Sequence, residues 1–307
     1  MVSRLEVEGD KLSRRLLSQI DDSGGAFGYI TGAMGGGKTS GLLFFLQYTM
    51  KYHPDQFIFL SETYDSPLQV FKIGENIAHF MVMEHSNVIF RDRNRHLKEV
   101  DLNPTYFKAR EVQYKKRNPD TNEVETRIRY IPDFEDLYRK AKTKRINIPF
   151  FGSRLYWMDF IAFLRHTGEW NHIFVDEIGE VIPTNTGGLL HRKIGEFANF
   201  SKDIRKCKLK VFSNTQSVRD VDWRIRDKFM YRIFLPGALA DPKHSRVAQR
   251  AIDNLQGDEI EGNNAYIDSR GKFGLITFTN IFKPNPNISI EAHIKTSEEY
   301  QLFGDEV

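Results

Sequence analysis

The sequence predicts an α/β fold in which an open, mostly parallel sheet is covered by helices on both faces. Two observations lead to this prediction. Strand-like and helix-like segments alternate from residue 27 to residue 235, and a glycine-rich loop joins the first strand to the first helix. Buried strands that alternate with helices are typical of parallel sheets, because each crossover places a helix over one face.

The segments expected to build this sheet are short and apolar. Residues 27–31 resemble a buried strand, and residues 38–51 a helix that is apolar around most of its circumference. Two alternating strands, 264–268 and 273–279, flank a Ser-Arg-Gly-Lys turn and predict a hairpin, because glycine tolerates the positive φ of such turns. The remaining predicted strands are 57–60, 172–175, 209–212 and 230–235, and the remaining helices 155–165 and 194–205.

Composition excludes several classes of protein. The 307 residues allow one large or two modest domains at about 150 residues per domain. With 40% hydrophobic and 28% charged residues, the chain is not wholly disordered. Its 44 basic and 41 acidic residues leave a net charge of +3, so a nucleic acid or membrane partner would have to meet a local patch. The single cysteine, Cys207, excludes an intrachain disulfide framework and a multi-cysteine metal site.

Neither export nor membrane insertion is predicted. Residues 1–10 mix charged and apolar side chains without the continuous apolar core of a signal peptide. The most apolar windows, 41–46 and 155–164, are shorter than the roughly 18 to 20 residues that span a bilayer. We therefore expect no membrane span and a cytoplasmic location, in the host cytoplasm or with the virion if the protein is viral.

Three regions are expected along the chain. Residues 1–24 form an N-terminal segment, 25–240 the core, and 241–307 a C-terminal extension that contains the hairpin. Within the core, residues 91–145 hold 16 basic and 10 acidic residues and few apolar runs. We interpret this stretch as an insertion or a solvated helical arm, with nucleic-acid contact as the alternative.

A phosphate-binding loop is the strongest motif. Residues 32–39 fit the pattern G-x-x-x-x-G-K-[ST] between an apolar strand and a helix. Four glycines in six positions let backbone N–H groups approach an anion, and the helix adds its unpaired N–H groups. Lys38 would reach the β- and γ-phosphates, and Thr39 would hold Mg²⁺. The candidate nucleotide-binding residues are Gly32, Ala33, Met34, Gly35, Gly36, Gly37, Lys38, Thr39 and Ser40.

Two adjacent acids follow a later apolar strand. Asp176 and Glu177 come directly after residues 172–175, where a parallel sheet would place them at its carboxyl edge. Asp176 would reach the Mg²⁺ shell, and Glu177 could take a proton from an attacking water molecule. Alternatively, both acids simply begin a solvated loop. The pair favours hydrolysis over binding alone, because a binding module has no need of a base.

Polar amides and arginines complete the candidate site. The strand near residue 210 ends in Ser213-Asn214-Thr215-Gln216, so Gln216 or Asn214 could report on the γ-phosphate; a strand-end cap or turn is the simpler alternative. Arg205 lies just upstream. Most charges of residues 220–227 are expected to form surface or interface pairs, but one arginine there could reach a neighbouring subunit's γ-phosphate.

Three patches, 32–39, 173–177 and 203–216, together resemble the FtsK–HerA superfamily of P-loop ATPases, and most of all its Zot-like and viral genome-packaging branches. The resemblance implies a RecA-like P-loop NTPase core and ATP hydrolysis with Mg²⁺ between subunits of a ring, suspected to be a hexamer, that moves double-stranded DNA. By position it implies that Lys38 and Glu177 are catalytic, Gln216 is the polar sensor, and Arg205 acts in trans, with Arg226 as its competitor. The sequence differs from this family in two ways. Zot-like phage proteins usually carry a membrane span after the ATPase domain, and none is predicted here. Residues 91–145 also match no feature of the family.

Two functions follow from the motifs. The first is an ATP-driven motor that translocates or packages a viral or plasmid genome. The second is a nucleotide-gated assembly or export factor whose partner is protein, such as a virion or portal protein. A small-molecule kinase using the same loop is disfavoured, because such enzymes usually lack a glutamate beside the aspartate.

Overall fold

The structure is a computed structural model that describes residues 20, 22, 24–33, 36–61, 78–92, 98–99, 103–118, 122–151, 153–184, 186–239, 249–250, 252–253, 264–269, 272–277 and 290–295. Within these residues, ten strands form the main sheet. Their order is β14 (Lys272–Thr277), β13 (Asn264–Ser269), β12 (Tyr231–Phe234), β1 (Ala26–Thr31), β11 (Leu209–Thr215), β10 (Asn171–Val175), β2 (Phe57–Leu60), β9 (Ile146–Phe150), β3 (Ala78–Met83) and β6 (Thr105–Phe107). From β12 to β6 all neighbours are parallel, while β13 and β14 extend the sheet antiparallel. The predicted fold class, an α/β fold with a mostly parallel sheet, is confirmed.

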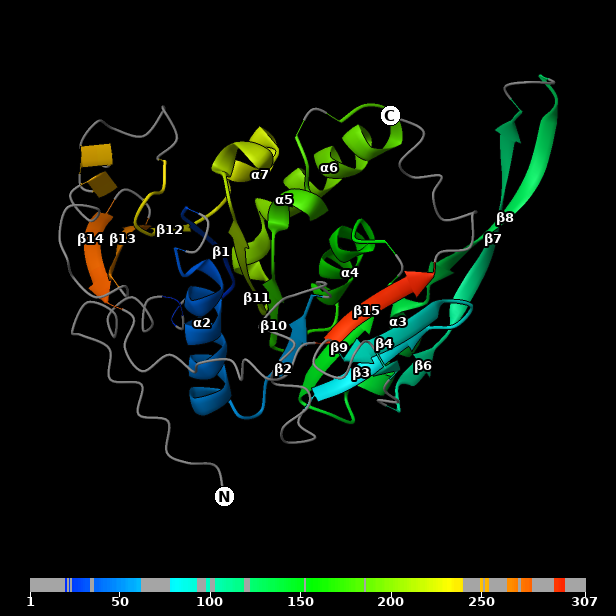
Figure 1. The fold of residues 1–307 in the computed structure, drawn as a ribbon, viewed down its shortest axis with the longest axis horizontal. Coiled ribbons are helices and arrows are strands. Elements are labelled where there is room, and N and C mark those ends of the chain that lie inside the picture. Colours follow the sequence, from blue (N-terminus) through cyan, green and yellow to red (C-terminus); the bar gives the residue numbers. More distant parts are fainter. Residues whose placement is uncertain are drawn as a thin grey trace.

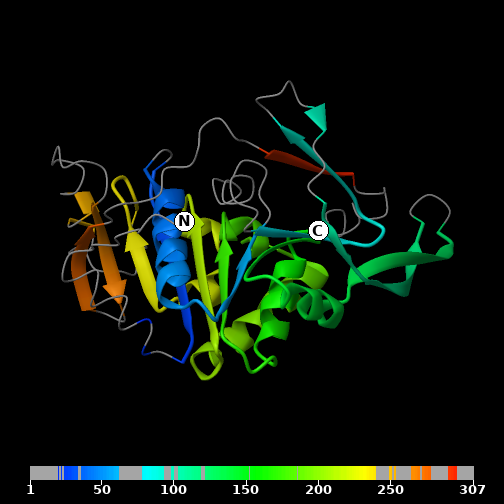
Figure 2. The same ribbon diagram turned by 90° about the horizontal axis from the view of Figure 1, so that it is seen from below.

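Helices cover both faces of this sheet, as Figures 1 and 2 show. Helix α2 (Lys38–Tyr52) packs over β1, β10 and β11 on one face. The opposite face carries α3 (Phe134–Ala141), α4 (Tyr156–Leu164), α6 (Gly188–Ser201) and the short α7 (Trp223–Arg226). Separate hydrophobic clusters fill the two interfaces, so the sheet is buried on both sides, as the continuous apolar strands predict.

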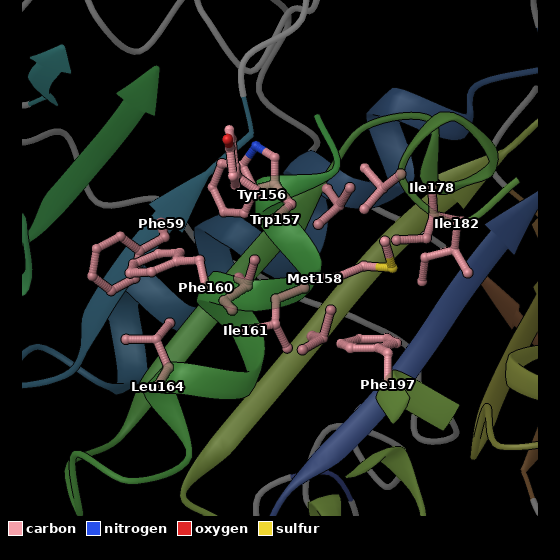
Figure 3. Close-up of a cluster of buried hydrophobic side chains, with 14 of the residues drawn as sticks. Phe59, Tyr156, Trp157, Met158, Phe160, Ile161, Leu164, Ile178, Ile182 and Phe197 are labelled. Carbon is pink, nitrogen blue, oxygen red and sulfur yellow. The ribbon is translucent and has the colours of Figure 1, made fainter. Parts of the chain in front are cut away.

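Aromatic side chains of α4 form the centre of the larger cluster (Figure 3). Trp157 and Phe160 are fully buried, and their rings meet edge to face with centroids 5.8 Å apart. Phe59 of β2 meets Phe160 in the same way at 5.0 Å. Burial of each such side chain contributes roughly 1.5–3 kcal/mol. This packing fixes α4 against the strands that lead to the sheet's carboxyl edge.

The ends of α2 are determined by particular residues. The helix begins after Gly37, whose φ of 83° is a left-handed conformation that glycine adopts without strain. At its other end, Arg145 donates hydrogen bonds to the carbonyl oxygens of Thr49, Met50 and His53 at 2.8–2.9 Å. The Thr49 carbonyl also accepts the His53 N–H at 3.0 Å. Because the guanidinium adds a charged donor to all three carbonyls, the arginine acts as a C-cap that complements the helix dipole.

The interpretation of residues 91–145 as a solvated helical arm is wrong. The described part contains β6, whose Phe107 is fully buried, the core helix α3, and two strands, β7 (Ala109–Arg117) and β8 (Val124–Pro132). β7 and β8 pair antiparallel as a ribbon that projects from the body (Figure 1). Burial alternates residue by residue over residues 111–117 of β7 and 124–129 of β8, which is the period of a strand and not of a helix. Nucleic-acid contact by this region remains a prediction.

A second, smaller sheet joins distant parts of the chain. It has the order β15 (Ile290–Lys295), β4 (Asn87–Asp92) and β5 (Lys98–Glu99), and its neighbours are antiparallel. The predicted hairpin is present as β13 and β14, and its strands extend the main sheet beyond β12; its turn at Arg270 and Gly271 lies outside the described residues. Within the described part of the chain, no helix combines the length and hydropathy needed to cross a membrane. The predicted division at residues 24 and 240 remains a prediction.

Candidate functional site

Three parallel strands bring the predicted motifs to one edge of the main sheet. β11 lies between β1 and β10, with Thr31 in register with Thr215 and Val175 in register with Ser213. The glycine-rich loop follows Thr31, and the acidic pair follows Val175. The two motifs therefore stand on either side of the carboxyl end of β11.

The glycine-rich loop is shaped by close backbone approaches. A Cβ at Gly32 would lie 2.9 Å from the Leu235 Cβ, and one at Gly36 would lie 3.0 Å from the Ala33 carbonyl oxygen. The Gly36 N–H donates to that same oxygen at 3.0 Å. A side chain at either position would therefore crowd its neighbours, which favours glycine at both. Met34 and Gly35 lie outside the described residues.

Lys38 is folded back over its own loop. Its Nζ donates to the carbonyl oxygens of Gly32 at 3.2 Å and Ala33 at 3.0 Å. Thr39 and Ser40 follow in the first turn of α2, and Thr39 is half-buried. A helix N-terminus with a lysine on a glycine loop favours anions, so the residues present fit the phosphates of a nucleotide.

Asp176 is held by residues of two other strands. Its carboxylate oxygen Oδ1 accepts a hydrogen bond from Asn214 Nδ2 at 2.5 Å, and its backbone N–H donates to Ser61 Oγ at 2.9 Å. Ser61 directly follows β2 and is buried. The half-buried Asp176 is therefore positioned from both sides, and together with Thr39 it offers the oxygen ligands that Mg²⁺ takes.

Glu177 occupies a left-handed backbone conformation, with φ of 55° and ψ of 67°. Such a conformation costs a non-glycine residue about 1–3 kcal/mol, and it persists only where the surroundings enforce it. The next residue, Ile178, begins the short helix α5 (Ile178–Val181) and is fully buried. The sharp turn at Glu177 therefore lets the chain leave β10 and return at once to the core.

The Glu177 carboxylate is bound by residues at the end of β11 and is close enough to Lys38 for the lysine charge to act on its pKa. Its Oε1 accepts hydrogen bonds from Thr215 Oγ1 at 3.0 Å and from the Gln216 N–H at 3.2 Å. Burial raises the pKa of Glu177; the bonds from Gln216 and Thr215 oppose this rise, the charge of Asp176 adds to it, and the charge of Lys38 lowers it. The glycine loop and the acidic pair thus come together, as the sequence predicts.

Asn214 connects the two acids, whereas Gln216 contacts only Glu177, and through its backbone. Asn214 is 2% exposed; besides its bond to Asp176, its Oδ1 accepts the Glu177 N–H at 2.7 Å. Gln216 is exposed; its N–H donates to Glu177 Oε1, and its carbonyl oxygen accepts a hydrogen bond from Thr31 Oγ1 at 3.3 Å. Of the two amides that the sequence offers, Asn214 is the one built into the site.

Several of these partners are not candidates in the sequence analysis. Ser61, Thr31 and Thr215 each lie at or just past the end of an apolar strand, and all three are buried. A small hydroxyl side chain at the carboxyl end of a parallel strand is the pattern that they share.

Arg205 lies at the opposite end of the strands from Lys38. It is exposed on the 3-10 helix η3 (Ile204–Lys206), which precedes β11. Gly24 and Gly25, just before β1, pack so closely on this turn that a Cβ at Gly25 would lie 2.0 Å from the Ile204 carbonyl oxygen. Arg226, at the end of α7, is half-buried. The structure therefore does not bring Arg205 to the site of its own chain.

The sequence matches no protein-family model and no curated protein. Among solved structures, the genome packaging NTPase B204 from Sulfolobus turreted icosahedral virus 2 in complex with AMPPCP is similar over 82% of this chain and 96% of its own, with 10% identity and a TM-score of 0.47. A DnaB-like replicative helicase is similar over 81% of this chain and 54% of its own, with 12% identity and a TM-score of 0.37. The N-terminal domain of zonular occludens toxin from Neisseria meningitidis is similar over 90% of this chain and 97% of its own, with 14% identity and a TM-score of 0.27. The fold class follows from the strand order and from the loop after β1.

Proposed function

We propose that this protein is an ATP-hydrolysing motor of the FtsK–HerA type that translocates or packages double-stranded DNA as a ring. The observation that carries the hydrolytic part is the position of Glu177. Its carboxylate is held by Thr215 and Gln216 beside Asp176, within the electrostatic reach of Lys38. A site that only binds nucleotide has no need of a fixed, partly buried carboxylate there.

Each residue then has a distinct role. The backbone of residues 32–37 and the Lys38 ammonium would hold the phosphates of ATP, and Thr39 and Asp176 would hold Mg²⁺, which supplies charge neutralisation when bound. Glu177 would accept the proton of the attacking water, because burial makes its carboxylate more basic. Asn214 would keep both acids in place, and Gln216 would act as the polar sensor.

The motor part of the proposal is supported by sequence. The three patches 32–39, 173–177 and 203–216 resemble the FtsK–HerA superfamily, and all three belong to β1, β10 and β11 or the segments that adjoin them. Arg205 lies exposed at the far end of these strands, where it could reach only a neighbouring subunit's nucleotide. A ring in which Arg205 acts in trans accounts for both features.

Steady-state ATP hydrolysis with and without duplex DNA tests the proposal. We expect the wild-type protein to hydrolyse ATP faster with DNA, and Glu177→Gln and Lys38→Ala each to lose a factor of about 10²–10⁴. Glu177→Gln should still bind ATP. Arg192→Gln, on the exposed face of α6, is a matched control and should keep wild-type activity. Full activity in Glu177→Gln would overturn the hydrolytic assignment.

The response to DNA separates the two functions that the sequence allows. Hydrolysis that no nucleic acid changes would refute the translocase, and stimulation by a virion or portal protein would then favour the Zot-like assembly factor. Mixed oligomers test the arginine separately. Arg205→Ala subunits mixed with Glu177→Gln subunits should regain some hydrolysis at mixed interfaces, whereas Arg226→Ala should keep its hydrolysis without any mixing.

A further inference from the structure

The β7–β8 ribbon is a firmly anchored arm. At its base, Lys108 donates its N–H to Asp136 Oδ2 at 2.9 Å and accepts the Asp133 N–H at 3.0 Å. On β8, Tyr130 stacks on His85 of the β3–β4 turn with ring centroids 4.3 Å apart. From this base both strands project away from the main sheet, as Figures 1 and 2 agree in showing. An arm that is rigid at its base can present a fixed surface at some distance from the nucleotide site.

The two faces of this ribbon differ in charge. In an antiparallel pair, residues opposite each other share a face, and every second residue returns to it. The face that we call the basic face carries Arg110, Val112, Tyr114 and Lys116 of β7, opposite Ile131, Arg129, Arg127 and Glu125 of β8. It thus has four basic residues and one acid, and that acid is in an ion pair with Arg127 at 2.8 Å. The opposite face has two basic residues, Lys115 and Arg117, and one acid, Glu111.

Positive charge is concentrated on the strands of the ribbon. Residues 109–117 and 124–132 hold six basic and two acidic residues, a net charge of +4, which exceeds the +3 of the whole chain. The connecting residues 118–123 add two acids, Asp120 and Glu123, to the sequence between the strands. The basic face carries a net charge of +3 (four basic residues and one acid) and the opposite face +1 (two and one), so most of the charge lies on one face, as a local site for an anionic polymer requires.

We propose that the basic face of the β7–β8 ribbon binds the phosphate backbone of double-stranded DNA. This inference rests on the proposed motor function and names the element that grips its substrate. A two-stranded ribbon is narrow enough to follow a groove of the duplex. Successive side chains on one face are about 6.8 Å apart, which is about twice the 3.4 Å axial rise per phosphate of a DNA strand. Arginine and lysine are the usual phosphate donors, and arginine can bind in a bidentate way.

Salt-dependent binding of the full-length chain to a short labelled duplex, measured without nucleotide, tests this proposal. The test variant combines Lys116→Gln with Arg129→Gln on the basic face. The matched control combines Lys115→Gln with Arg117→Gln, which removes the same charge from the other face of the same strands. Because each lost phosphate contact reduces the slope of log K against log salt by about 0.9, we expect the slope of the test variant to fall by about 2 and that of the control to stay close to wild type.

Further measurements make the outcomes distinct. Lys116→Arg with Arg129→Lys should restore the slope, and both double variants should keep the basal ATP hydrolysis and melting temperature of wild type. If the wild-type protein binds duplex and both double variants keep its slope of log K against log salt, the ribbon is not the DNA-binding element. That result would leave the motor function standing. Equal losses in both variants would overturn the face assignment, and competition by polyglutamate as strong as that by duplex would indicate an acidic protein partner instead. Absence of ATP hydrolysis in a wild-type protein that shows the expected slopes would refute only the motor function.

Discussion

The Asn214 amide joins Asp176 to the backbone of Glu177, with its Nδ2 2.5 Å from the Asp176 Oδ1 and its Oδ1 2.7 Å from the Glu177 nitrogen. Asn214 belongs to β11, and both acids follow β10. One side chain therefore fixes the relative position of the proposed metal ligand and the proposed base. The register between β10 and β11 therefore determines how the two acids are placed relative to each other.

Replacement of Asn214 by alanine should lower both activity and stability. The substitution leaves the Glu177 N–H without its acceptor in a partly buried place, which costs about 1–3 kcal/mol. We expect a larger loss of kcat than for Gln216→Ala, whose side chain is exposed. Rates under saturating ATP, measured together with urea unfolding, check this expectation. A larger effect of Gln216→Ala on kcat would show that the exposed amide is the one that acts in hydrolysis.

Glu177→Gln should gain stability over the wild type as the pH rises. The pKa of Glu177 in the folded protein is raised above its ordinary value of 4.5, mainly by burial. Between these two values the folded state binds more protons than the unfolded state, so wild-type stability falls with increasing pH by up to about 1.4 kcal/mol per unit. Glutamine keeps the acceptor oxygen and does not titrate. Urea midpoints of both proteins from pH 4 to 8 would contradict this if their difference stayed constant.

Arg145→Met should weaken the end of α2. The guanidinium donates to three helix-terminal carbonyl oxygens, and hydrogen bonds to charged groups contribute about 1.5–3 kcal/mol. We expect a loss of this size in the free energy of unfolding, partly recovered in Arg145→Lys. Chemical denaturation measures it, with Arg192→Met on the exposed face of α6 as the control. Equal midpoints for Arg145→Met and the control would show that the cap is not needed.

Buried His172 should make the protein sensitive to mild acid. Its Nε2 pairs with Gln56 and its Nδ1 with Thr49, and burial, together with the charges of Lys210, His53 and Arg145, holds its pKa well below 6.5. The unfolded chain therefore binds the extra proton below pH 6.5, and stability falls with decreasing pH at up to about 1.4 kcal/mol per unit.

His172→Gln should flatten this pH dependence, whereas His166→Gln, at an exposed position, should leave it unchanged. Thermal melts between pH 5 and 7.5 would detect the difference. The same slope in His172→Gln as in the wild type would assign the acid sensitivity to another group.

The elements with a strong local pattern could be predicted from the sequence. β1, α2 and β10 combine apolar runs with a motif, and the structure places them as expected. β6 has three residues at the edge of the sheet, which is too short for a pattern to show. β7 and β8 alternate between exposed and half-buried polar residues, so their period of two is almost invisible in hydrophobicity.

The motifs of the site could be predicted from the sequence, but the hydrogen bonds that join them could not. The glycine loop and the acidic pair each have a recognisable sequence, and their meeting follows from the common edge of parallel strands. The role of Asn214 depends on the pairing of Val175 with Ser213, and that of Ser61 on the position of β2 beside β10. Such partners are determined by tertiary register, which no single segment of sequence specifies.

The pairing of β4 with β15 has a consequence for how the protein is made. Once the ribosome has passed residue 235, it has synthesised β1, β10 and β11, the strands that carry the candidate site. Residues 87–92, in contrast, cannot pair with residues 290–295 until those have also been synthesised. Domains generally begin to fold during synthesis. The nascent chain would therefore carry the finished ends of β1, β10 and β11 while β4 still has no β15 beside it. Translation stalled in that interval would leave this backbone edge of β4 open to strand exchange or aggregation.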